Sequence, residues 1–339
     1  MRNIGIIGAG SWGTALAKNL ANNGHAVTIW SIMEDEIRML NEHREHIDKL
    51  PGVKLPEDMV FTCDIKETIE GKDMLVLAVP SIFTRSTAKS MAPFVVDGQI
   101  IVCVAKGIEE HTLMTISEVV EDEIPNADVT VLCGPSHAEE VGIGLPTTIV
   151  AGAKTRQTAE LVQDTFMNEA FRVYTSPDVL GMELGGSLKN VIALAAGMAD
   201  GLGYGDNTKA ALITRGIAEI SRLAVAMGAK PETLNGLTGI GDLIVTCQSK
   251  HSRNRRAGML MGQGMTMKEA TEEVKMVVEG VHSAKAALAL AKKYYITMPI
   301  IEQVNLVLFE DKSAKEAVTD LMVREKRAES ISLDWTVKN

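Results

Sequence analysis

The sequence predicts an α/β fold: an N-terminal Rossmann-like, doubly wound and mainly parallel sheet, followed by an all-α C-terminal domain. Through residue 180, short apolar runs alternate with helical patterns, whereas the residues that follow are periodic only at helical spacing. A glycine-rich turn stands directly after the first apolar run. A chain of 339 residues is long enough for two domains, and we place them at 1–180 and 181–334.

The composition limits the partners. Apolar residues make up 46% of the chain and charged residues 23%, as in ordinary globular proteins. A net charge of −10 argues against nucleic acid or an anionic membrane surface as a partner. An anionic substrate would then need a local cluster of positive charge. We also expect a homodimer, although the composition does not bear on the assembly.

The four cysteines are scattered, without the spacing of a zinc site, and they indicate reduced thiols in a cytoplasmic protein. No metal is expected. No apolar run reaches the roughly 18 to 20 residues of a membrane span, and no signal peptide precedes Arg2.

The first apolar run, residues 3–7, leads into the pattern GxGxxG, and a helical pattern follows over 14–21. In this context the pattern predicts a dinucleotide site. Gly8 makes the tight turn, Gly10 lets the backbone approach a pyrophosphate, and Gly13 lets the helix pack on the strand. The alternatives are a purely structural turn or the related loop of a methyltransferase.

Further strands are predicted at residues 26–30, 74–78, 100–104 and 129–132, and a smaller αβ unit at 147–175. Ligands of such sheets lie beyond the carboxyl ends of the strands. Lys106 follows one of these ends and is expected at the ligand edge, with a solvated loop lysine as the alternative. Ser136 is expected to cap the next helix, and His137 to be structural. Residues 41–60 are expected to form a mobile flap outside the core.

Residues 182–197 are almost uncharged but contain Lys189. On a helix, Gly185, Gly186 and Ala193 share its face. These small residues suggest close packing, or space for a ligand beside the ammonium group. The alternative is a surface lysine on a closely packed helix.

A basic cluster occurs in the second half, where four Lys and Arg residues fall within residues 250–256. Arg253, near a helix start that Ser252 or Asn254 would cap, suits a phosphate. The alternative is a solvated basic face. Asp242 lies beside an apolar run, where burial requires a partner, and Lys189 would supply it.

These residues together resemble the NAD(P)-dependent sn-glycerol-3-phosphate dehydrogenases of bacterial type. The resemblance covers nearly the whole chain through GAGSWGTALA (8–17), VPS (79–81), AKGIE (105–109), GPSHAEEV (134–141), LKNV (188–191), GIGDLIVTC (239–247) and SRNRR (252–256). It implies reversible reduction of dihydroxyacetone phosphate, which supplies the glycerophospholipid precursor.

The resemblance also implies the residue roles. Lys189 would be the catalytic acid–base, supported by Lys106, Asn190, Asp242 and Thr246. The substrate would be bound by Lys106, Gly134, Ser136, Lys189, Asp242, Ser252, Arg253 and Asn254. Beside the glycines of the turn, the cofactor would contact Ser11, Trp12, Ser31, Lys106, Ala138, Arg253, Val277 and Glu279.

One departure concerns the cofactor. Many members of the family have a basic residue after the second strand, whereas this chain has Ser31-Ile32-Met33. We therefore expect use of both NAD and NADP, with a mild preference for NADP. Two alternatives to the function remain: a β-hydroxyacid or 6-phosphogluconate type dehydrogenase, and a non-catalytic redox sensor.

Overall fold

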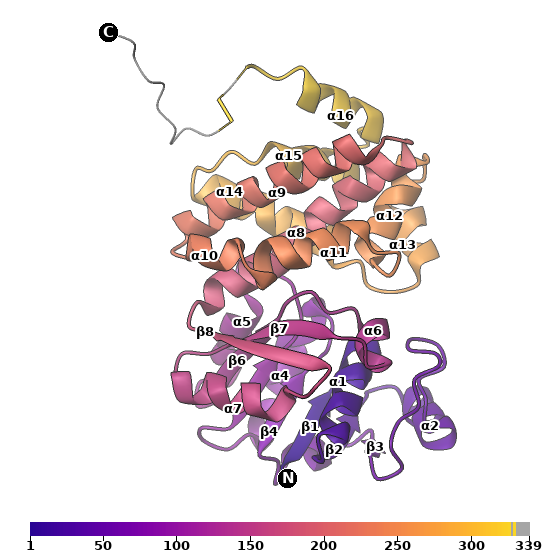
Figure 1. The fold of residues 1–339 in the computed structure, drawn as a ribbon, viewed down its shortest axis with the longest axis vertical. Coiled ribbons are helices and arrows are strands. Elements are labelled where there is room, and N and C mark those ends of the chain that lie inside the picture. The colour runs from indigo at the N-terminus through magenta and orange to yellow at the C-terminus, as the bar shows by residue number, and fades with distance from the viewer. Residues whose placement is uncertain (327, 330–339) are drawn as a thin grey trace.

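The computed structural model describes residues 1–326 and 328–329. It shows a sheet domain below a helical domain, with the chain running from one to the other along a single long helix (Figure 1). The predicted C-terminal boundary at residue 334 lies outside the described residues, and the division at 180/181 stays a prediction.

The sheet has eight strands in the order β3-β2-β1-β4-β5-β6-β7-β8. All neighbouring strands are parallel except β6 and β7. The order reverses between β1 and β4, and such a switch point is where open α/β sheets bind ligands. The strands are β1 (Asn3–Ile7), β2 (Ala26–Trp30), β3 (Val60–Thr62), β4 (Met74–Leu77), β5 (Ile100–Cys103), β6 (Asp128–Cys133), β7 (Thr147–Gly152) and β8 (Phe171–Ser176).

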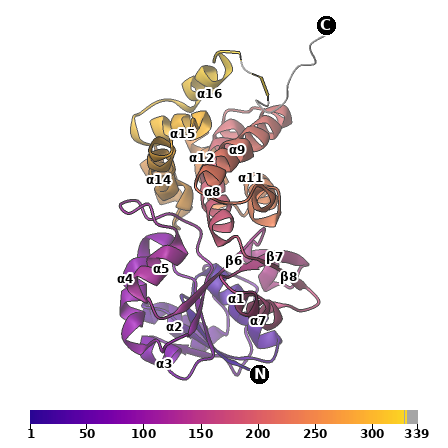
Figure 2. The ribbon, with the colours of Figure 1, turned by 90° about the vertical axis from the view of Figure 1, so that its left-hand side faces the viewer.

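Two apolar layers bury the two faces of this sheet. One layer contains side chains of α1, α2 and α7, and the other contains side chains of α3, α4 and α5. Figure 2 shows α4 and α5 on one side of the sheet and α1 and α7 on the other. Their bounds are α1 (Ser11–Asn22), α2 (Glu34–His43), α3 (Ile65–Ile69), α4 (Thr84–Met91), α5 (Ile116–Glu123), α6 (Ala138–Gly142) and α7 (Arg156–Phe166).

The helical domain is built around α8 (Val179–Gly201), whose residues from Gly181 to Ala199 are all buried. It packs on α9, α11, α12 and α14. The remaining helices are α9 (Asp206–Ala226), α10 (Pro231–Leu234), α11 (Asp242–Gln248), α12 (Arg253–Gly262), α13 (Met267–Val274), α14 (Glu279–Lys293), α15 (Pro299–Phe309) and α16 (Ala314–Met322). A π-helical turn, Leu237–Gly241, precedes α11.

Glycines set how closely α8 and α12 approach. A Cβ on Gly197 would lie 2.0 Å from the carbonyl oxygen of Arg255, and one on Gly258 would lie 2.1 Å from that of Leu194. Because real Cβ atoms do not come so near, these backbones pass each other only without side chains. α8 is long and apolar enough to cross a membrane, the one such helix in the described part of the chain, but the protein itself buries it.

One prediction about this scaffold is wrong. Residues 41–60 are not a flap outside the core, because Leu50, Val53 and Leu55 are buried in the same apolar layer as α1. These apolar residues are separated by polar ones in the sequence, so the segment shows no apolar run that would predict its burial. The close packing expected at the small residues beside Lys189 is confirmed, because a Cβ on Gly185 would meet the backbone of Thr238 and one on Gly186 the sulfur of Cys133.

Candidate active site

The turn after β1 fits the phosphates of a dinucleotide. Gly8 has φ +119°, and its Cβ would strike the backbone of Ala78. Next to Gly10 nothing lies within 4 Å of an added Cβ, so an anion has room there. No side chain caps α1, and no acidic residue stands in its first turn, which begins with Ser11 and Trp12. The backbone N–H groups of this helix start are therefore suited to an anion.

Lys189 lies deep in the helical domain, where its Nζ meets two residues of α11. It donates to Thr246 Oγ1 at 2.5 Å and forms an ion pair with Asp242 Oδ1 at 2.8 Å. Thr246 in turn donates to the carbonyl oxygen of Asp242 at 2.6 Å. The pairing of Asp242 with Lys189 predicted from the sequence is therefore confirmed.

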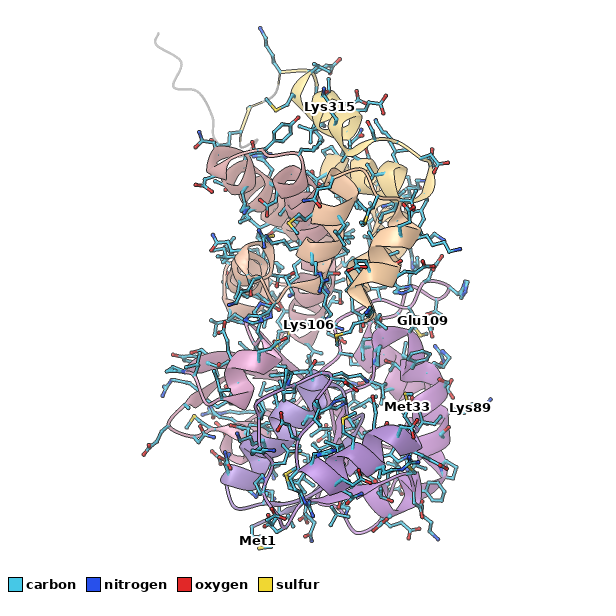
Figure 3. All side chains as sticks on the ribbon, turned by 90° about the vertical axis from the view of Figure 1, so that its right-hand side faces the viewer. Met1, Met33, Lys89, Lys106, Glu109 and Lys315 are labelled. Atoms are coloured by element: carbon cyan, nitrogen blue, oxygen red, sulfur yellow. The ribbon has the colours of Figure 1, made fainter. Side chains whose placement is uncertain are left out.

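Lys106 reaches the same carboxylate from the sheet domain. It follows β5 and lies where the two domains meet (Figure 3). Its Nζ donates to Asp242 Oδ2 at 2.6 Å and to the carbonyl oxygen of Gly134 at 3.0 Å. Asp242, whose side chain is 2% exposed, therefore holds one ammonium group on each oxygen. Lys106 therefore lies beyond the carboxyl end of β5, as expected, and its contact with a ligand stays a prediction.

Burial and charge act differently on these three groups. Burial lowers the pKa of Lys189, Asp242 opposes this and Lys106 adds to it, and the net direction is downward. Burial alone would lower the pKa of Lys106, but Asp242 raises it above its ordinary value. Burial alone would raise the pKa of Asp242, but the two lysines hold it below the usual range. Lys189 is therefore the more acidic ammonium group.

Ser136 and His137 lie in the turn that follows β6. Ser136 donates from its hydroxyl to the carbonyl oxygen of Gly134 at 2.9 Å. It does not cap a helix, since α6 begins after His137 and has no side-chain cap. The prediction of a capping role for Ser136 is wrong because the helix starts two residues later. Ala138 is the first residue of α6 and is buried. Burial, with the charges of Lys189 and Lys106, lowers the pKa of His137 to about 4.

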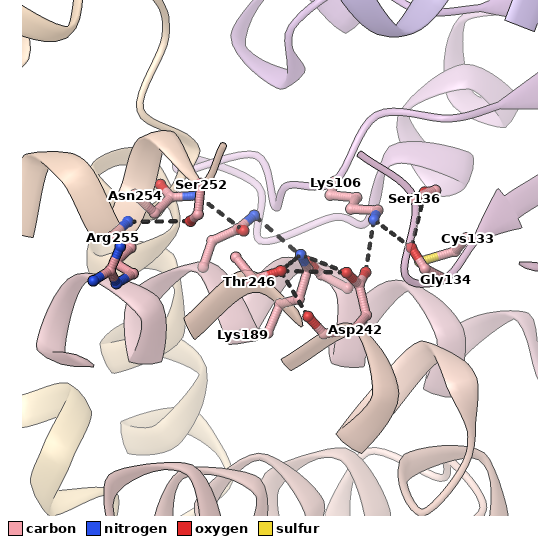
Figure 4. Close-up of polar contacts among 12 residues, drawn as sticks. Lys106, Cys133, Gly134, Ser136, Lys189, Asp242, Thr246, Ser252, Asn254 and Arg255 are labelled. Atoms are coloured by element: carbon pink, nitrogen blue, oxygen red, sulfur yellow. Dashed lines mark hydrogen bonds and ion pairs between the residues drawn. The ribbon is translucent and has the colours of Figure 1, made fainter. Parts of the chain in front are cut away.

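A second group of residues continues the row of polar side chains toward α12, as Figure 4 shows from Gly134 and Ser136 at one end to Asn254 and Arg255 at the other. Asn254 donates to Asn190 Oδ1 at 3.0 Å and accepts from the N–H of Gly280 at 2.8 Å. Ser252 caps α12 by accepting from the N–H of Arg255. A cap at Ser252, one of the two predicted, is thus confirmed.

Three arginines of the basic cluster differ in their partners. Arg255 pairs with Asp200 at 2.6 Å and Arg256 with Glu273 at 3.7 Å. Arg253 contacts only the carbonyl oxygen of Val277, at 3.2 Å, and forms no ion pair within residues 1–326 and 328–329. Of these three arginines, Arg253 is therefore the one whose charge remains open to an anionic ligand.

Glu279, at the start of α14 and two residues after the Val277 that Arg253 contacts, connects the helical domain to the sheet domain. Its carboxylate accepts from the N–H of Ser81 at 3.0 Å and from the Ser81 hydroxyl. Ser81 belongs to the VPS motif after β4, for which the sequence suggested no individual role. Glu279 and Val277 therefore lie at the interdomain edge, where the resemblance places cofactor contacts.

The end of β2 holds a cluster that the sequence did not reveal. Ser31 donates to Glu36 at 2.6 Å, and Lys49 binds the same carboxylate. His46 Nε2 lies 3.6 Å from Glu36. Burial alone would raise the pKa of Glu36, but His46, Lys49 and Ser31 lower it to about 2. The signal was weak because Lys49 stands 13 residues after Glu36, in the segment interpreted as a flap.

A dinucleotide turn at the switch point of the sheet, and a buried carboxylate that holds one lysine from each domain, define a two-domain dehydrogenase. Two family models cover the chain: NAD-dependent glycerol-3-phosphate dehydrogenase N-terminus matches residues 3–159, and the C-terminus model matches residues 178–319. The chain belongs to the NAD-dependent glycerol-3-phosphate dehydrogenase family.

Individual relatives agree along their whole length. A glycerol-3-phosphate dehydrogenase [NAD(P)+] of Agathobacter rectalis is 78% identical over 335 residues, 99% of this chain and 100% of the relative. The protein of that name from Bacillus subtilis is 51% identical over 100% of this chain and 99% of its own. The crystal structure of glycerol-3-phosphate dehydrogenase from Coxiella burnetii has a TM-score of 0.92 at 38% identity, covering 95% of this chain and 99% of that one. The chain is thus an NAD(P)-dependent oxidoreductase, and neither a β-hydroxyacid dehydrogenase nor a redox sensor.

Proposed function

We propose that the chain reduces dihydroxyacetone phosphate to sn-glycerol 3-phosphate with Lys189 as the proton donor. Reduction adds a hydride to C2 and a proton to the C2 oxygen. The nicotinamide cofactor supplies the hydride when bound, and the ammonium group of Lys189 supplies the proton. The observation that carries this assignment is the single Asp242 carboxylate, which holds Lys189 and Lys106 on its two oxygens.

The lowered pKa of Lys189 suits this role. A general acid works best when its pKa lies near the working pH, and burial moves Lys189 in that direction. Before transfer, the ammonium group stabilises the negative charge that develops on the C2 oxygen. In the reverse reaction, neutral Lys189 takes the hydroxyl proton of sn-glycerol 3-phosphate. Asp242 and Thr246 fix the position of Nζ in both directions.

The row of polar residues suggests how the substrate lies. We place the phosphate at the start of α12, near Ser252, Arg253 and Asn254, because Arg253 has no acidic partner there. The carbonyl group then falls at Lys189, in the middle of the row, and the C1 hydroxyl toward Lys106, Gly134 and Ser136.

The cofactor would be held by residues of both domains. Its phosphates would lie on the turn of Gly8, Gly10 and Gly13, and its outer ribose near Ser31. We propose use of both dinucleotides with a mild preference for NADPH. Ser31 itself is engaged by Glu36, so a 2′ group would have to share or displace that hydrogen bond.

We place the enzyme in the cytoplasm as a homodimer that supplies a glycerophospholipid precursor. Support for a reducing compartment comes from its cysteines, which are free in the described structure although Cys63 is exposed.

The test is the oxidation of NADH and NADPH, followed at 340 nm as the reduced cofactor disappears. Dihydroxyacetone phosphate should be turned over, and unphosphorylated dihydroxyacetone very poorly. Equal rates with the two compounds, or activity with a β-hydroxyacid alone, would refute the proposed substrate.

A further inference from the structure

The segment that leads from Lys106 to α5 is fastened to α8, the helix that carries Lys189. Ser187 donates from its hydroxyl to the carbonyl oxygen of Gly107 at 3.0 Å. One turn earlier, Glu183 accepts from the N–H of Ser117 at 2.9 Å and from its hydroxyl at 2.5 Å. Both side chains of α8 are buried. The helix is therefore hydrogen-bonded to this segment at two points, at Gly107 next to Lys106 and at Ser117 ten residues later.

The segment between these two points is short and closed. Ile108 and Thr115 form an antiparallel bridge, so its two ends stay together. On its other side Arg85 of α4 binds Glu109, at 2.8 and 2.7 Å. Figure 3 shows Lys106 and Glu109 at the level where the domains meet. A displacement of this segment would therefore carry Lys106 with it.

Glu183 is an unusual residue for such a position. Burial raises the pKa of its carboxyl group, and the hydrogen bonds from Ser117 oppose that rise. A buried carboxylate is costly unless hydrogen bonds compensate; here the N–H and the hydroxyl of Ser117, in the first turn of α5, both donate to it. It touches neither Lys106 nor Lys189, and the proposed reaction has no proton for it to transfer.

We propose that Glu183 and Ser187 are positioning residues, which hold Lys106 and Lys189 on opposite oxygens of Asp242. This role rests on the proposed function, because it matters only if Lys189 transfers the proton. The two residues lie on one face of α8, and Lys189 follows Ser187 by two residues. One helix thereby fixes both ammonium groups, although Lys106 belongs to the other domain.

The proposal has a consequence for the acidity of Lys189. The groups that face Lys189 are Asp242, Thr246 and Cys247 of α11, Lys106 after β5, Cys133 of β6 and His137 of the next turn. Among them, Lys106 lowers the pKa of Lys189 and Asp242 raises it. If Lys106 moves away from Asp242, its charge no longer repels the ammonium group of Lys189. Asp242 then pairs with Lys189 only. Both changes raise the pKa of Lys189.

The experiment compares Ser187→Ala and Glu183→Gln with the unaltered enzyme. The pH dependence of kcat/KM is measured for oxidation of sn-glycerol 3-phosphate, which needs neutral Lys189. We expect the rising limb to move to higher pH by about half a unit, and kcat/KM near neutral pH to fall about threefold, since one pKa unit is a tenfold change in the protonation equilibrium. Reduction of dihydroxyacetone phosphate should keep its activity to correspondingly higher pH.

Two controls separate positioning from stability. Ser283→Ala removes an equally buried hydroxyl on α14 that has no hydrogen-bond partner. Glu219→Gln alters a buried carboxylate of α9 that accepts from the N–H groups of Ile300 and Ile301 at the start of α15. Neither contacts Lys106 or its segment, so both should leave the pH limb in place even if the melting temperature changes.

The outcomes are distinct. If Ser187→Ala and Glu183→Gln only lower the melting temperature and keep the limb of the unaltered enzyme, the positioning role is refuted. Should Glu183→Gln fail to fold, Ser187→Ala decides alone. If the unaltered enzyme does not turn over dihydroxyacetone phosphate at all, the proposed function fails instead.

Discussion

In two clusters of this molecule a carboxylate is held by basic side chains, but the clusters differ in how far apart their members lie in the sequence. At the proposed reaction centre, Asp242 holds Lys106 and Lys189; at the end of β2, Glu36 holds Lys49, with His46 nearby. The first cluster joins residues far apart in the sequence, whereas all members of the second lie within residues 31–49. The Asp242 side chain is 2% exposed and that of Glu36 is 12% exposed.

The difference shows what burial adds to an ion pair. In the Asp242 cluster two cations compete for one buried carboxylate, and Lys189 is left with a lowered pKa. In the Glu36 cluster the pKa of the carboxyl group falls to about 2, so the carboxylate stays charged at every physiological pH. One arrangement yields a group that exchanges a proton, and the other a fixed charge beside the expected cofactor ribose.

The largest expected effect comes from removing the proposed proton donor. Lys189→Met should lower kcat by roughly 10²–10⁴-fold, the range for positioned acid–base groups, with the fold and NADH binding preserved. The matched control is Lys209→Met, which removes a lysine bound to Asp200 outside the Asp242 cluster. More than a tenth of the original activity in Lys189→Met would exclude this lysine from the mechanism.

Removing the shared carboxylate should rank second. Without Asp242 the pKa of Lys189 falls further, so Asp242→Asn leaves less of the ammonium form that reduction needs. An opposite charge at this distance shifts a pKa by about 1–3 units, and we expect kcat near neutral pH to fall about 10–1,000-fold. The alkaline limb of the reduction profile should move to lower pH.

A double variant tests whether Asp242 acts through Lys189. In the Lys189→Met background, Asp242→Asn should cost little additional activity, because coupled residues are not additive. A full additional loss would assign Asp242 an independent role.

The third effect concerns the anionic end of the substrate. A charge-assisted hydrogen bond is worth roughly 1.5–3 kcal/mol, so Arg253→Ala should lower kcat/KM for dihydroxyacetone phosphate by about 10–150-fold. Arg256→Ala is the control, because that arginine already faces Glu273. If both variants behave alike, the basic cluster is only a solvated face.

The smallest effect is expected at the Glu36 cluster. Values of kcat/KM for NADH and NADPH, measured at one ionic strength, should differ by less than about tenfold, or roughly 1.4 kcal/mol. Lys49→Met should reduce the preference for NADPH, whereas Arg38→Met should not, since Arg38 is exposed and paired with Asp35. A preference beyond about a hundredfold would mean that another residue reads the 2′ position.

Much of the fold was predictable because its signals are local. The alternation of apolar runs with helical patterns predicted the parallel sheet, and the predicted cap at Ser252 marked a helix start that the structure confirms. Residues 41–60 were not predictable in this way. Their few apolar side chains become core only when a layer that includes α1 lies against them, which is a tertiary effect.

The candidate site also has a part that local sequence signals predict and a part that only tertiary contacts create. Residue chemistry alone predicted that Asp242 needs Lys189, and strand-end logic placed Lys106 at the site. Three contacts join segments that are distant in the sequence. They are the bond of Lys106 to the second oxygen of Asp242, the hydrogen bonds of Glu183 and Ser187 to the segment after Lys106, and the contact of Glu279 with Ser81. No spacing rule connects such pairs, so they required the three-dimensional structure.

The glycines between α8 and α12 carry a last consequence, for mutational scanning. A methyl group at Gly197 or Gly258 would push α12 outward, and Arg253 and Asn254 at its start would move away from Lys189. Such variants would score as loss of function in a selection, although neither glycine has a functional group. The positions that tolerate no substitution would therefore include glycines that set the distance between α8 and α12, as well as residues that take part in the reaction.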